Sequence, residues 1–279
     1  MSKQEKELYK ITALTNIHVG SGDQNYGIVD KLVQRDPLSQ FPIIHASSLK
    51  GALKKYCESN DGFAAPDILS SFGGDDYQGN DKYFSAHLLT IPVRSNVKPY
   101  FRATCPAILK ELHELLKSFG INSGSNFYKA VDILATIYLK TNVFCVFGTW
   151  NTEDCIIEEY SLTASKILKD NDLFKKEELA NWIYKAEEFI IIADNLFMEI
   201  CENLPVVARN RLDKKKNLWY EELVPRQSDF YFFYVGNKIN RIAIMDEIVN
   251  KSEKEMPVQI GANASIGYGY CKIDKISQS

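Results

Sequence analysis

The stretch that decides the fold runs from His18 to Leu53 and reads HVGSGDQNYGIVDKLVQRDPLSQFPIIHASSLKGAL. Before it, residues 6–19 alternate apolar and polar side chains, a pattern that predicts a β-strand. The loop Gly20-Ser21-Gly22 follows, and its glycines tolerate positive φ and let backbone N–H groups come close to a ligand. Asp30 then places one isolated carboxylate in polar sequence shortly after that loop.

The second half of the stretch predicts a short buried strand over residues 41–46 and a helix over residues 47–58. Ser47 or Ser48 is a natural N-cap for this helix. A helix that begins there directs N–H groups and its positive dipole end at whatever lies in front, which favours phosphate. Lys50 adds a positive charge in the first turn. The features together predict a phosphate site, although each alone is also common as ordinary turn or helix structure.

The bulk composition is that of an ordinary globular protein, with 279 residues, 45% of them hydrophobic and 25% charged. The formal net charge of −3 counts against a free-standing nucleic-acid-binding protein that relies on bulk positive charge. A local RNA groove on a subunit with protein neighbours is compatible with it. The six cysteines form no CxxC pair, so we expect free thiols in a reducing cytoplasm and no zinc site. Neither a membrane span nor an apolar signal-peptide core is predicted.

The middle of the chain, residues 105–203, is predicted to be a largely helical insertion. Apolar residues recur at helical spacing over residues 107–119, 127–139 and 177–203. Residues 143–149 are the exception, because their continuous apolar run predicts a buried strand.

The flanking segments, residues 1–104 and 204–279, mix strands, helices and loops and together predict one α+β core within a single domain. Residues 205–226 carry a hairpin signal, since two β-like runs are joined by the basic, turn-prone sequence DKKKN. The alternative is an ordinary exposed hairpin whose lysines add solubility. Residues 230–235 then predict an aromatic strand, and residues 241–252 predict a helix.

A glycine-rich loop near the C-terminus, residues 259–269, reads QIGANASIGYG. Its glycines allow close backbone approach to a ligand, and Asn263 and Ser265 can donate to phosphate oxygens. The loop lacks the G-x-G-x-x-G pattern and a strand rather than a helix follows it, so a nucleotide-cofactor enzyme is disfavoured. Residues 94–102 interleave basic and aromatic side chains, which suits single-stranded nucleic acid or an edge strand with solvated charges.

The order of these motifs resembles the RAMP superfamily of CRISPR RNA-binding proteins. A G-S-G loop, then G-x-V-D, Q-R-D and S-L-K-G follow one another between residues 20 and 51. Within the superfamily, residues 27–36 and 217–222 are similar to the repeating backbone subunit of the type III-B effector, the Cmr complex. Residues 259–269 resemble the superfamily's glycine-rich C-terminal loop. The resemblance implies a ferredoxin-like (RRM-like) core with a helical insertion, in which the hairpin 205–226 is a thumb that wedges between guide and target strands.

The resemblance also implies a function. Several copies would assemble along a guide (CRISPR) RNA, with other subunits of the effector complex, and cut complementary single-stranded target RNA at regular intervals. Asp30 matches the loop aspartate that the family requires for cutting. By analogy the cut depends on Mg²⁺ or another divalent cation held at Asp30, exploits the ribose 2′-OH and leaves a 2′,3′-cyclic phosphate. Such a complex would be cytoplasmic.

The residues expected to contact RNA lie in the loops, the helix start and the hairpin. They are Gly20, Ser21, Gly22, Arg35, Ser47, Ser48, Lys50, Lys54, Arg94, Arg209, Lys214, Lys215, Gly261, Asn263 and Gly267. His18 is a possible accessory residue, because a ribonuclease without metal would use a histidine as general acid or base. The adjacent acids Glu221 and Glu222 face opposite ways in a strand, so we interpret both as hairpin structure.

Two other functions remain open from the residues alone. The chain could be a non-catalytic guide-RNA-binding scaffold of the same kind of complex, with Asp30 acting only as a loop cap. It could also be a free-standing, metal-independent endoribonuclease that processes guide precursors with His18 as the base. Replacement of Asp30 and removal of metal distinguish the three hypotheses.

Overall fold

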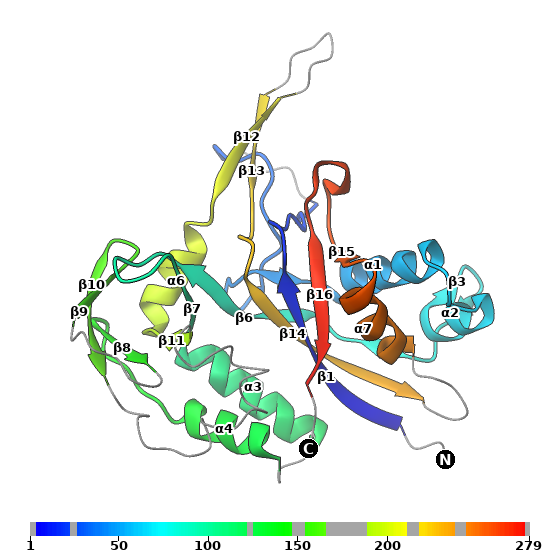
Figure 1. The fold of residues 1–279 in the computed structure, drawn as a ribbon, viewed down its shortest axis with the longest axis horizontal. Coiled ribbons are helices and arrows are strands. Elements are labelled where there is room, and N and C mark those ends of the chain that lie inside the picture. Colours follow the sequence, from blue (N-terminus) through cyan, green and yellow to red (C-terminus); the bar gives the residue numbers. More distant parts are fainter. Residues whose placement is uncertain are drawn as a thin grey trace. The chain divides into compact units, whose positions relative to one another are not determined.

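The computed structural model describes residues 4–22, 27–121, 125–146, 154–165, 189–210, 218–237 and 244–276. The chain forms two compact units (Figure 1), the first made of residues 1–88 and 202–275 and the second of residues 89–201 and 276–279. Both units contain helices and strands, so the α+β class predicted from the sequence is confirmed.

The first unit is built on a sheet in which segments far apart in the sequence are neighbours. Its strands β15 (Val258–Gln259), β16 (Tyr270–Lys275), β1 (Gln4–Ala13) and β14 (Asp229–Asn237) follow one another in this order. The next strand, β6 (Ala86–Val93), begins in this unit and continues into the second. Short strands are added at its side: β2 (Ile43–Ile44) pairs with β6, and β5 (Lys82–Tyr83) pairs with β14.

The helices of the first unit are α1 (Ala46–Ser59), α2 (Ala65–Phe72) and α7 (Ile244–Lys254). A small hairpin of β3 (Gly73–Gly74) and β4 (Tyr77–Gln78) follows α2, and a 3₁₀ turn, η2 (Ala264–Ile266), lies in the glycine-rich loop. Helix α1 contacts β15 and α7 contacts β16. The buried face of α1 repeats at helical spacing, with Leu49, Leu53, Tyr56 and Cys57 directed into the core.

Helix α1 begins one residue earlier than predicted, and neither serine caps it. The N-cap residue is His45, whose side chain makes no capping hydrogen bond, while Ser47 and Ser48 lie inside the first turn. The Oγ of Ser85 supplies the acceptor instead, because it receives the Ala46 N–H at 3.1 Å. The predicted serine N-cap is therefore wrong, and a residue in the β5–β6 connection accepts an N–H group at the start of the helix instead.

Strand β1 is also shorter than the predicted residues 6–19. It ends at Ala13, beyond which the N–H groups of Leu14 and Thr15 both donate to the Tyr270 carbonyl. Ile17 then forms an isolated bridge with Val224, so this segment leaves the sheet to meet the chain that enters from the hairpin.

The hairpin predicted over residues 205–226 is present as a separate antiparallel pair, β12 (Val206–Asn210) and β13 (Leu218–Glu222). Val206 lies opposite Glu222, and Asn210 lies opposite Leu218. Figure 1 shows the pair as an arm that projects from the sheet of the first unit. Lys214 and Lys215, which were expected to bind RNA, lie outside the described residues.

In the described part of the second unit, the strand order β7-β11-β8-β10-β9 is accompanied by helices α3, α4 and α6. The helices are α3 (Pro106–Phe119), α4 (Asn126–Ala135) and α6 (Asp194–Glu202). The strands are β7 (Phe101–Thr104), β8 (Val143–Val146), β9 (Asp154–Ile157), β10 (Tyr160–Ser165) and β11 (Phe189–Ile191). Strand β11 is parallel to β7, and β10 is parallel to β8.

The helical insertion predicted over residues 105–203 is only partly helical, because β8 to β11 also lie within it. The helix predicted over residues 177–203 is wrong in its described part, where strand β11 precedes the short helix α6. Residues 189–191 are a buried apolar run, and periodicity alone does not distinguish such a run from a buried helix. Among the described residues, no helix is long and apolar enough to cross a membrane.

Candidate active site

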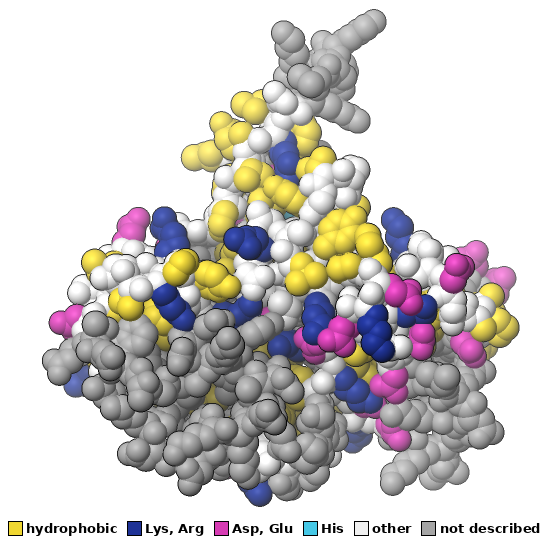
Figure 2. Space-filling view, in the orientation of Figure 1, with side chains coloured by type: hydrophobic (Ala, Val, Ile, Leu, Met, Phe, Trp, Pro, Cys, Tyr) yellow, Lys and Arg dark blue, Asp and Glu magenta, His cyan; other side chains and the backbone are white. Residues whose placement is uncertain are grey.

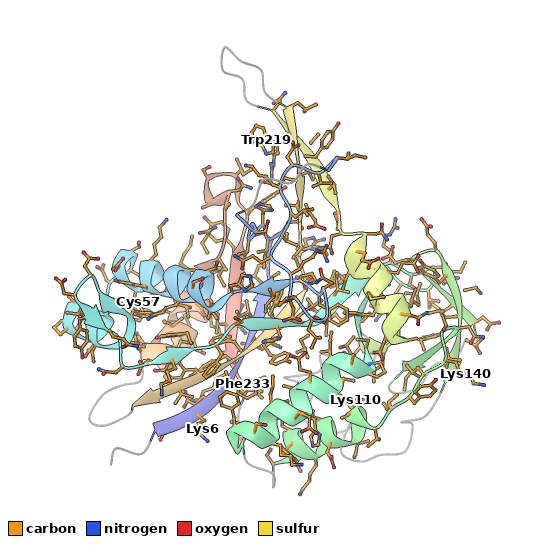
Figure 3. All side chains as sticks on the ribbon, turned by 180° about the vertical axis from the view of Figure 1, so that it is seen from behind. Lys6, Cys57, Lys110, Lys140, Trp219 and Phe233 are labelled. Atoms are coloured by element: carbon orange, nitrogen blue, oxygen red, sulfur yellow. The ribbon has the colours of Figure 1, made fainter. Side chains whose placement is uncertain are left out.

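Asp30 lies at the base of the hairpin, where it is bonded to Tyr220 of β13 in both directions. The Tyr220 N–H donates to Asp30 Oδ2 at 2.7 Å, and the Asp30 N–H donates back to the Tyr220 carbonyl at 3.1 Å. The side chains of Asp30 and Tyr220 are both exposed. The loop carboxylate is thus fixed to strand β13 through one oxygen and is exposed to solvent. The label of Trp219 in Figure 3 marks this strand.

The segment after Asp30 is attached to the same strand by Glu222. The Glu222 N–H donates to the Lys31 carbonyl at 2.9 Å, and Glu222 Oε2 accepts the Val33 N–H at 3.0 Å. Its other oxygen, Oε1, pairs with Arg35 Nη2 at 2.5 Å. Glu222 is 4% exposed, so its buried carboxylate connects the hairpin to residues 33 and 35, and its backbone N–H connects it to residue 31.

Glu221 is the second buried carboxylate of the hairpin base, and it is only 1% exposed. Its Oε2 accepts hydrogen bonds from Arg209 Nε at 3.1 Å and from Asn263 Nδ2 at 2.8 Å. Its Oε1 lies 3.9 Å from Lys31 Nζ. Since a buried charge is tolerated only when it is paired and hydrogen-bonded, Glu221 holds β12, the Asp30 loop and the glycine-rich loop together.

His18 is enclosed in the same junction and is 3% exposed. Its Nδ1 lies 2.7 Å from the Glu222 carbonyl, which only accepts, so Nδ1 carries the proton in this arrangement. Its Nε2 faces Glu221 Oε1 at 3.6 Å. The geometry therefore makes His18 a contact between the first strand and the hairpin, and does not present it to a substrate as a base.

Two glycines approach His18 closely. A Cβ on Gly261, whose φ is +90°, would lie 2.4 Å from the His18 carbonyl oxygen, and a Cβ on Gly20 would lie 3.1 Å from His18 Nε2. The same carbonyl accepts the Ala262 N–H at 2.8 Å. Gly261 is thus required for the close packing on the His18 backbone, whereas a Cβ at Gly20 would be tight against the His18 ring.

The side chains of Gln34 and Asp36 also make hydrogen bonds within the protein. Gln34 Nε2 donates to the Gly20 carbonyl and to Ser48 Oγ, and its Oε1 accepts the His45 N–H at 2.8 Å. The side chain of Gln34 therefore joins the first glycine loop to the start of α1.

Asp36 Oδ1 accepts hydrogen bonds from the N–H groups of Leu38 and Ser39, at 3.0 and 2.8 Å, and from Ser39 Oγ. Burial acts to raise the pKa of Asp36, but the hydrogen bonds from Ser39 and Leu38 outweigh it and lower that pKa below its ordinary value. The carboxylate form thus stabilises the turn between the Asp30 loop and β2.

The structure brings several of the residues predicted to bind RNA together at the junction between the Asp30 loop, the hairpin and the glycine-rich loop, where they contact His18, Gln34, Glu221 or Glu222. Those at the junction are Gly20, Arg35, Ser48, Arg209, Gly261 and Asn263. Others lie elsewhere on their units. Lys54 donates to the Gly73 carbonyl at 2.9 Å, and Arg94, in the second unit, pairs with Glu158. Ser21, Gly22, Ser47 and Gly267 are exposed, and Lys50 is half-buried.

The sequence places Glu221 and Glu222 on opposite faces of a hairpin strand, but both are buried at the junction, and it does not indicate the role of Tyr220. The available signal was the position of two adjacent acids directly before the apolar Leu223 and Val224, since buried acids are almost always paired. Two further contacts complete the junction: the Arg209 guanidinium lies 4.5 Å from the Tyr268 ring, and Lys31 Nζ lies 5.0 Å from the Trp219 ring.

The described residues contain no group of three or more histidines, cysteines or acids that could hold a metal ion. Asp30 supplies one carboxylate, of which Oδ2 already accepts the Tyr220 N–H. Such a donor set fits only a cation that takes its other ligands from a substrate and from water, which is common for Mg²⁺ at phosphate-transfer sites.

Comparison with known proteins shows which family this chain resembles. The family model described as the RAMP superfamily matches residues 10–272. The "CRISPR system Cmr endoribonuclease Cmr4" of Pyrococcus furiosus is 28% identical over 287 residues, with 95% of this chain and 94% of that protein covered.

Solved structures show the same fold. A type III-B Cmr-beta complex bound to cognate target RNA contains a chain with a TM-score of 0.79 and 24% identity, covering 98% of this chain and 97% of that one. Oligomeric Cmr4 from Pyrococcus furiosus gives a TM-score of 0.69 at 22% identity, with 97% of each chain covered. Because the family model spans nearly the whole sequence, this chain belongs to the RAMP superfamily.

Proposed function

We propose that this chain is the repeating backbone subunit of a type III-B CRISPR effector complex, and that it cleaves target RNA at Asp30. The observation that supports this most is the exposed Asp30 carboxylate, held at the hairpin base by the Tyr220 N–H. The similarity to a named Cmr endoribonuclease extends over 95% of the chain, so it includes both the loop and the hairpin. The proposed partners are guide RNA, target RNA, further copies of this chain and other subunits of a cytoplasmic complex.

The fold suits this role. The strand order β16-β1-β14-β6, with α1 between β1 and β6 and α7 between β14 and β16 in the sequence, supports the proposed ferredoxin-like core. The hairpin acts as the thumb that separates guide from target. Its apolar side chains are exposed, as Figure 2 shows, with Val206 at 45%, Leu218 at 60% and Tyr220 at 39%. The ring of Tyr220 can stack against a base without reading its sequence, and the aliphatic Val206 and Leu218 can add apolar contact.

In the proposed reaction, the target ribose 2′-OH attacks the adjacent phosphorus in line. The 2′-O–P bond forms while the P–O5′ bond breaks, which leaves a 2′,3′-cyclic phosphate and a 5′-OH. Asp30 orients the 2′-OH and accepts its proton, and the leaving 5′-oxygen takes a proton from solvent. The role of the protein is chiefly to hold the carboxylate and the target backbone in this geometry.

A divalent cation such as Mg²⁺ is part of the proposal. When bound, it would neutralise charge on the scissile phosphate, and Asp30 is the residue that would contribute to holding it. Cleavage is then expected to stop in EDTA and to return when Mg²⁺ is added in excess. Full cleavage in EDTA would contradict the metal requirement without affecting the assignment of Asp30.

The second candidate is a guide-binding scaffold without cleavage. It is favoured by the hydrogen bond between Asp30 Oδ2 and the Tyr220 N–H, because a loop cap makes the same contact. Under this reading Asp30 closes the loop against β13 and does nothing chemical.

The test compares wild type with Asp30→Asn in the assembled particle, with guide and labelled complementary target. Asparagine can still accept the Tyr220 N–H through its carbonyl oxygen, so the substitution removes charge and leaves the loop contact. Cleavage is expected to fall at least about 100-fold with target binding unchanged. Asp61→Asn, at an exposed acid in a turn of the same unit, is the control and should cut normally. Normal cutting by Asp30→Asn, or tight binding without cutting by the wild type, would contradict the proposal.

A further inference from the structure

Arg35 was expected to contact RNA, but the structure uses its guanidinium inside the protein. Nη2 pairs with Glu222 Oε1 at 2.5 Å, and Nη1 donates to the Gln40 carbonyl at 2.9 Å. The side chain of Arg35 is 18% exposed and that of Glu222 is 5% exposed. One end of the guanidinium thus holds the turn after the loop, and the other holds the hairpin.

Glu222 is the residue through which this pair reaches the Asp30 loop. Its second carboxylate oxygen accepts the Val33 N–H at 3.0 Å, and its own N–H donates to the Lys31 carbonyl at 2.9 Å. Residues 31 and 221 form only an isolated parallel bridge, so no continuous ladder holds this segment to β13. The side chains of Glu222 and Arg35 therefore hold this segment to β13, as a ladder of backbone hydrogen bonds does in a regular strand pair.

The consequence for Asp30 follows from the chain order. Asp30 is bonded to Tyr220, two residues before Glu222 on β13, while Val33 and Arg35 hold the other end of the same loop. If the carboxylate at position 222 is lost, the half-buried Arg35 charge loses its carboxylate partner and the Val33 N–H loses its acceptor. The loop can then shift against the hairpin, and displacement of a catalytic group by about 1 Å is enough to slow a reaction greatly.

We propose that Arg35 and Glu222 are positioning residues, a half-buried ion pair that fixes the Asp30 carboxylate against the hairpin for RNA cleavage. The expected effect on cleavage rests on the proposed function. The expected effect on the structure of the Asp30 loop does not depend on that function. The competing role for Arg35 is a direct phosphate contact, which would act on RNA affinity and its salt dependence.

The experiment uses assembled particles that carry Glu222→Gln, Arg35→Gln, Arg35→Lys or the two glutamine changes combined. Single-turnover cleavage at saturating particle is measured beside the target Kd at several salt concentrations. Hydrogen exchange of the wild-type and variant chains follows the amides of residues 29–35. Glu255→Gln is the matched control, because Glu255 pairs with Lys251 on α7 at 3.1 Å, away from the loop.

We expect Glu222→Gln and Arg35→Gln to cut about 10 to 100 times more slowly while the target Kd stays within about twofold. The double variant should be no slower than the slower single variant, since the two residues act as one unit. Arg35→Lys should recover part of the rate, because it keeps the charge but loses the planar fork. Amide exchange over residues 29–35 should quicken in the slow variants and stay unchanged in Glu255→Gln.

Unchanged exchange in Glu222→Gln would overturn the proposal whatever the cleavage rate. A weaker Kd with a reduced salt slope, but a normal saturated rate, in Arg35→Gln would also overturn it in favour of a phosphate contact. Failure of the proposed function looks different, because Asp30→Asn would then cut as the wild type does, or the wild type would not cut at all. If Asp30 is not catalytic but exchange over residues 29–35 is still faster in Glu222→Gln, the Arg35–Glu222 pair fixes the loop. Its role in cleavage would then be refuted.

Discussion

Glu221 shows how much a single buried side chain can connect at this site. Its carboxylate meets Arg209, Asn263, Lys31 and His18 while being 1% exposed. Removing one partner of a buried ion pair leaves uncompensated charge, which costs far more than the loss of a surface pair.

Glu221→Ala is therefore expected to lower the free energy of unfolding by about 3 kcal/mol, because it leaves Arg209 without its acceptor. Urea denaturation followed by circular dichroism measures this loss. Glu58→Ala is the control, since Glu58 is exposed and lies 3.9 Å from Lys54. Its effect should stay below about 1 kcal/mol, and equal losses in the two variants would refute the network.

The lowered pKa of Asp36 makes the stability of the folded chain depend on pH. Its pKa is lowered in the folded chain, so its carboxylate adds stability above the unfolded pKa, and this is lost as pH falls through the folded pKa. Asp36→Asn should thus be less stable than wild type by about 1 kcal/mol at pH 7. The difference should shrink below about pH 4, which denaturation at a series of pH values will show. A difference that is constant down to pH 2 would contradict this account of the turn.

At the scale of single residues, the sequence indicated Asp30 through its motif but could not show what holds it. Asp30 and its partner Tyr220 are 190 residues apart, and Arg35 and Glu222 are 187 apart. The serine N-cap failed for the same reason, since the acceptor is Ser85 from a distant part of the chain. Local spacing carries no information about such partners.

At the scale of elements, periodicity predicted α3 within one residue, because Leu109, Leu112 and Leu116 repeat on its buried face. The residue Pro106 begins this helix and Gly120, with φ of 64°, ends it. Periodicity failed at β11, a short apolar run whose strand state depends on pairing with β7 and β8. The helix with a clear amphipathic face and the buried strands β2, β8 and β14 were predictable, whereas the strand state of the β11 run was not.

The glycine-rich loop provides a matched pair of glycines. Both Gly261 and Gly267 have positive φ, but a Cβ at 261 meets the His18 carbonyl whereas a Cβ at 267 meets nothing within 4 Å. Gly267→Ala should cost about 1 kcal/mol of stability from backbone strain alone. Gly261→Ala should cost at least about 1 kcal/mol more, because the clash adds to the strain. Thermal unfolding of the two variants tests this, and equal shifts would show that the loop does not pack on His18 as described.

At the scale of the whole molecule, all six cysteines are buried. Burial raises the pKa of the Cys57 thiol to about 12 and that of Cys271 further, so little reactive thiolate exists near neutral pH. The folded chain should react very slowly with a thiol reagent at pH 8, and all six thiols should react in denaturant. Rapid labelling of the native protein would contradict the core described here.

The global charge of −3 and the local grouping of Arg35, Arg209 and Lys31 also belong to this scale. From the net charge, the sequence predicts that any RNA surface is local and not a property of the whole chain. It could not show that two of these cations are committed to Glu221 and Glu222, since that depends on the folded junction.

Under the proposed function, each copy of the chain cuts one position of the target with its own Asp30. Particles reconstituted from wild-type and Asp30→Asn chains in known ratios, with guide and end-labelled target, test it most directly. We expect each cut to weaken in proportion to the mutant fraction, while the spacing of the cuts and the target Kd stay unchanged. Cleavage that is independent of the mutant fraction would place the chemistry outside Asp30 and contradict the account.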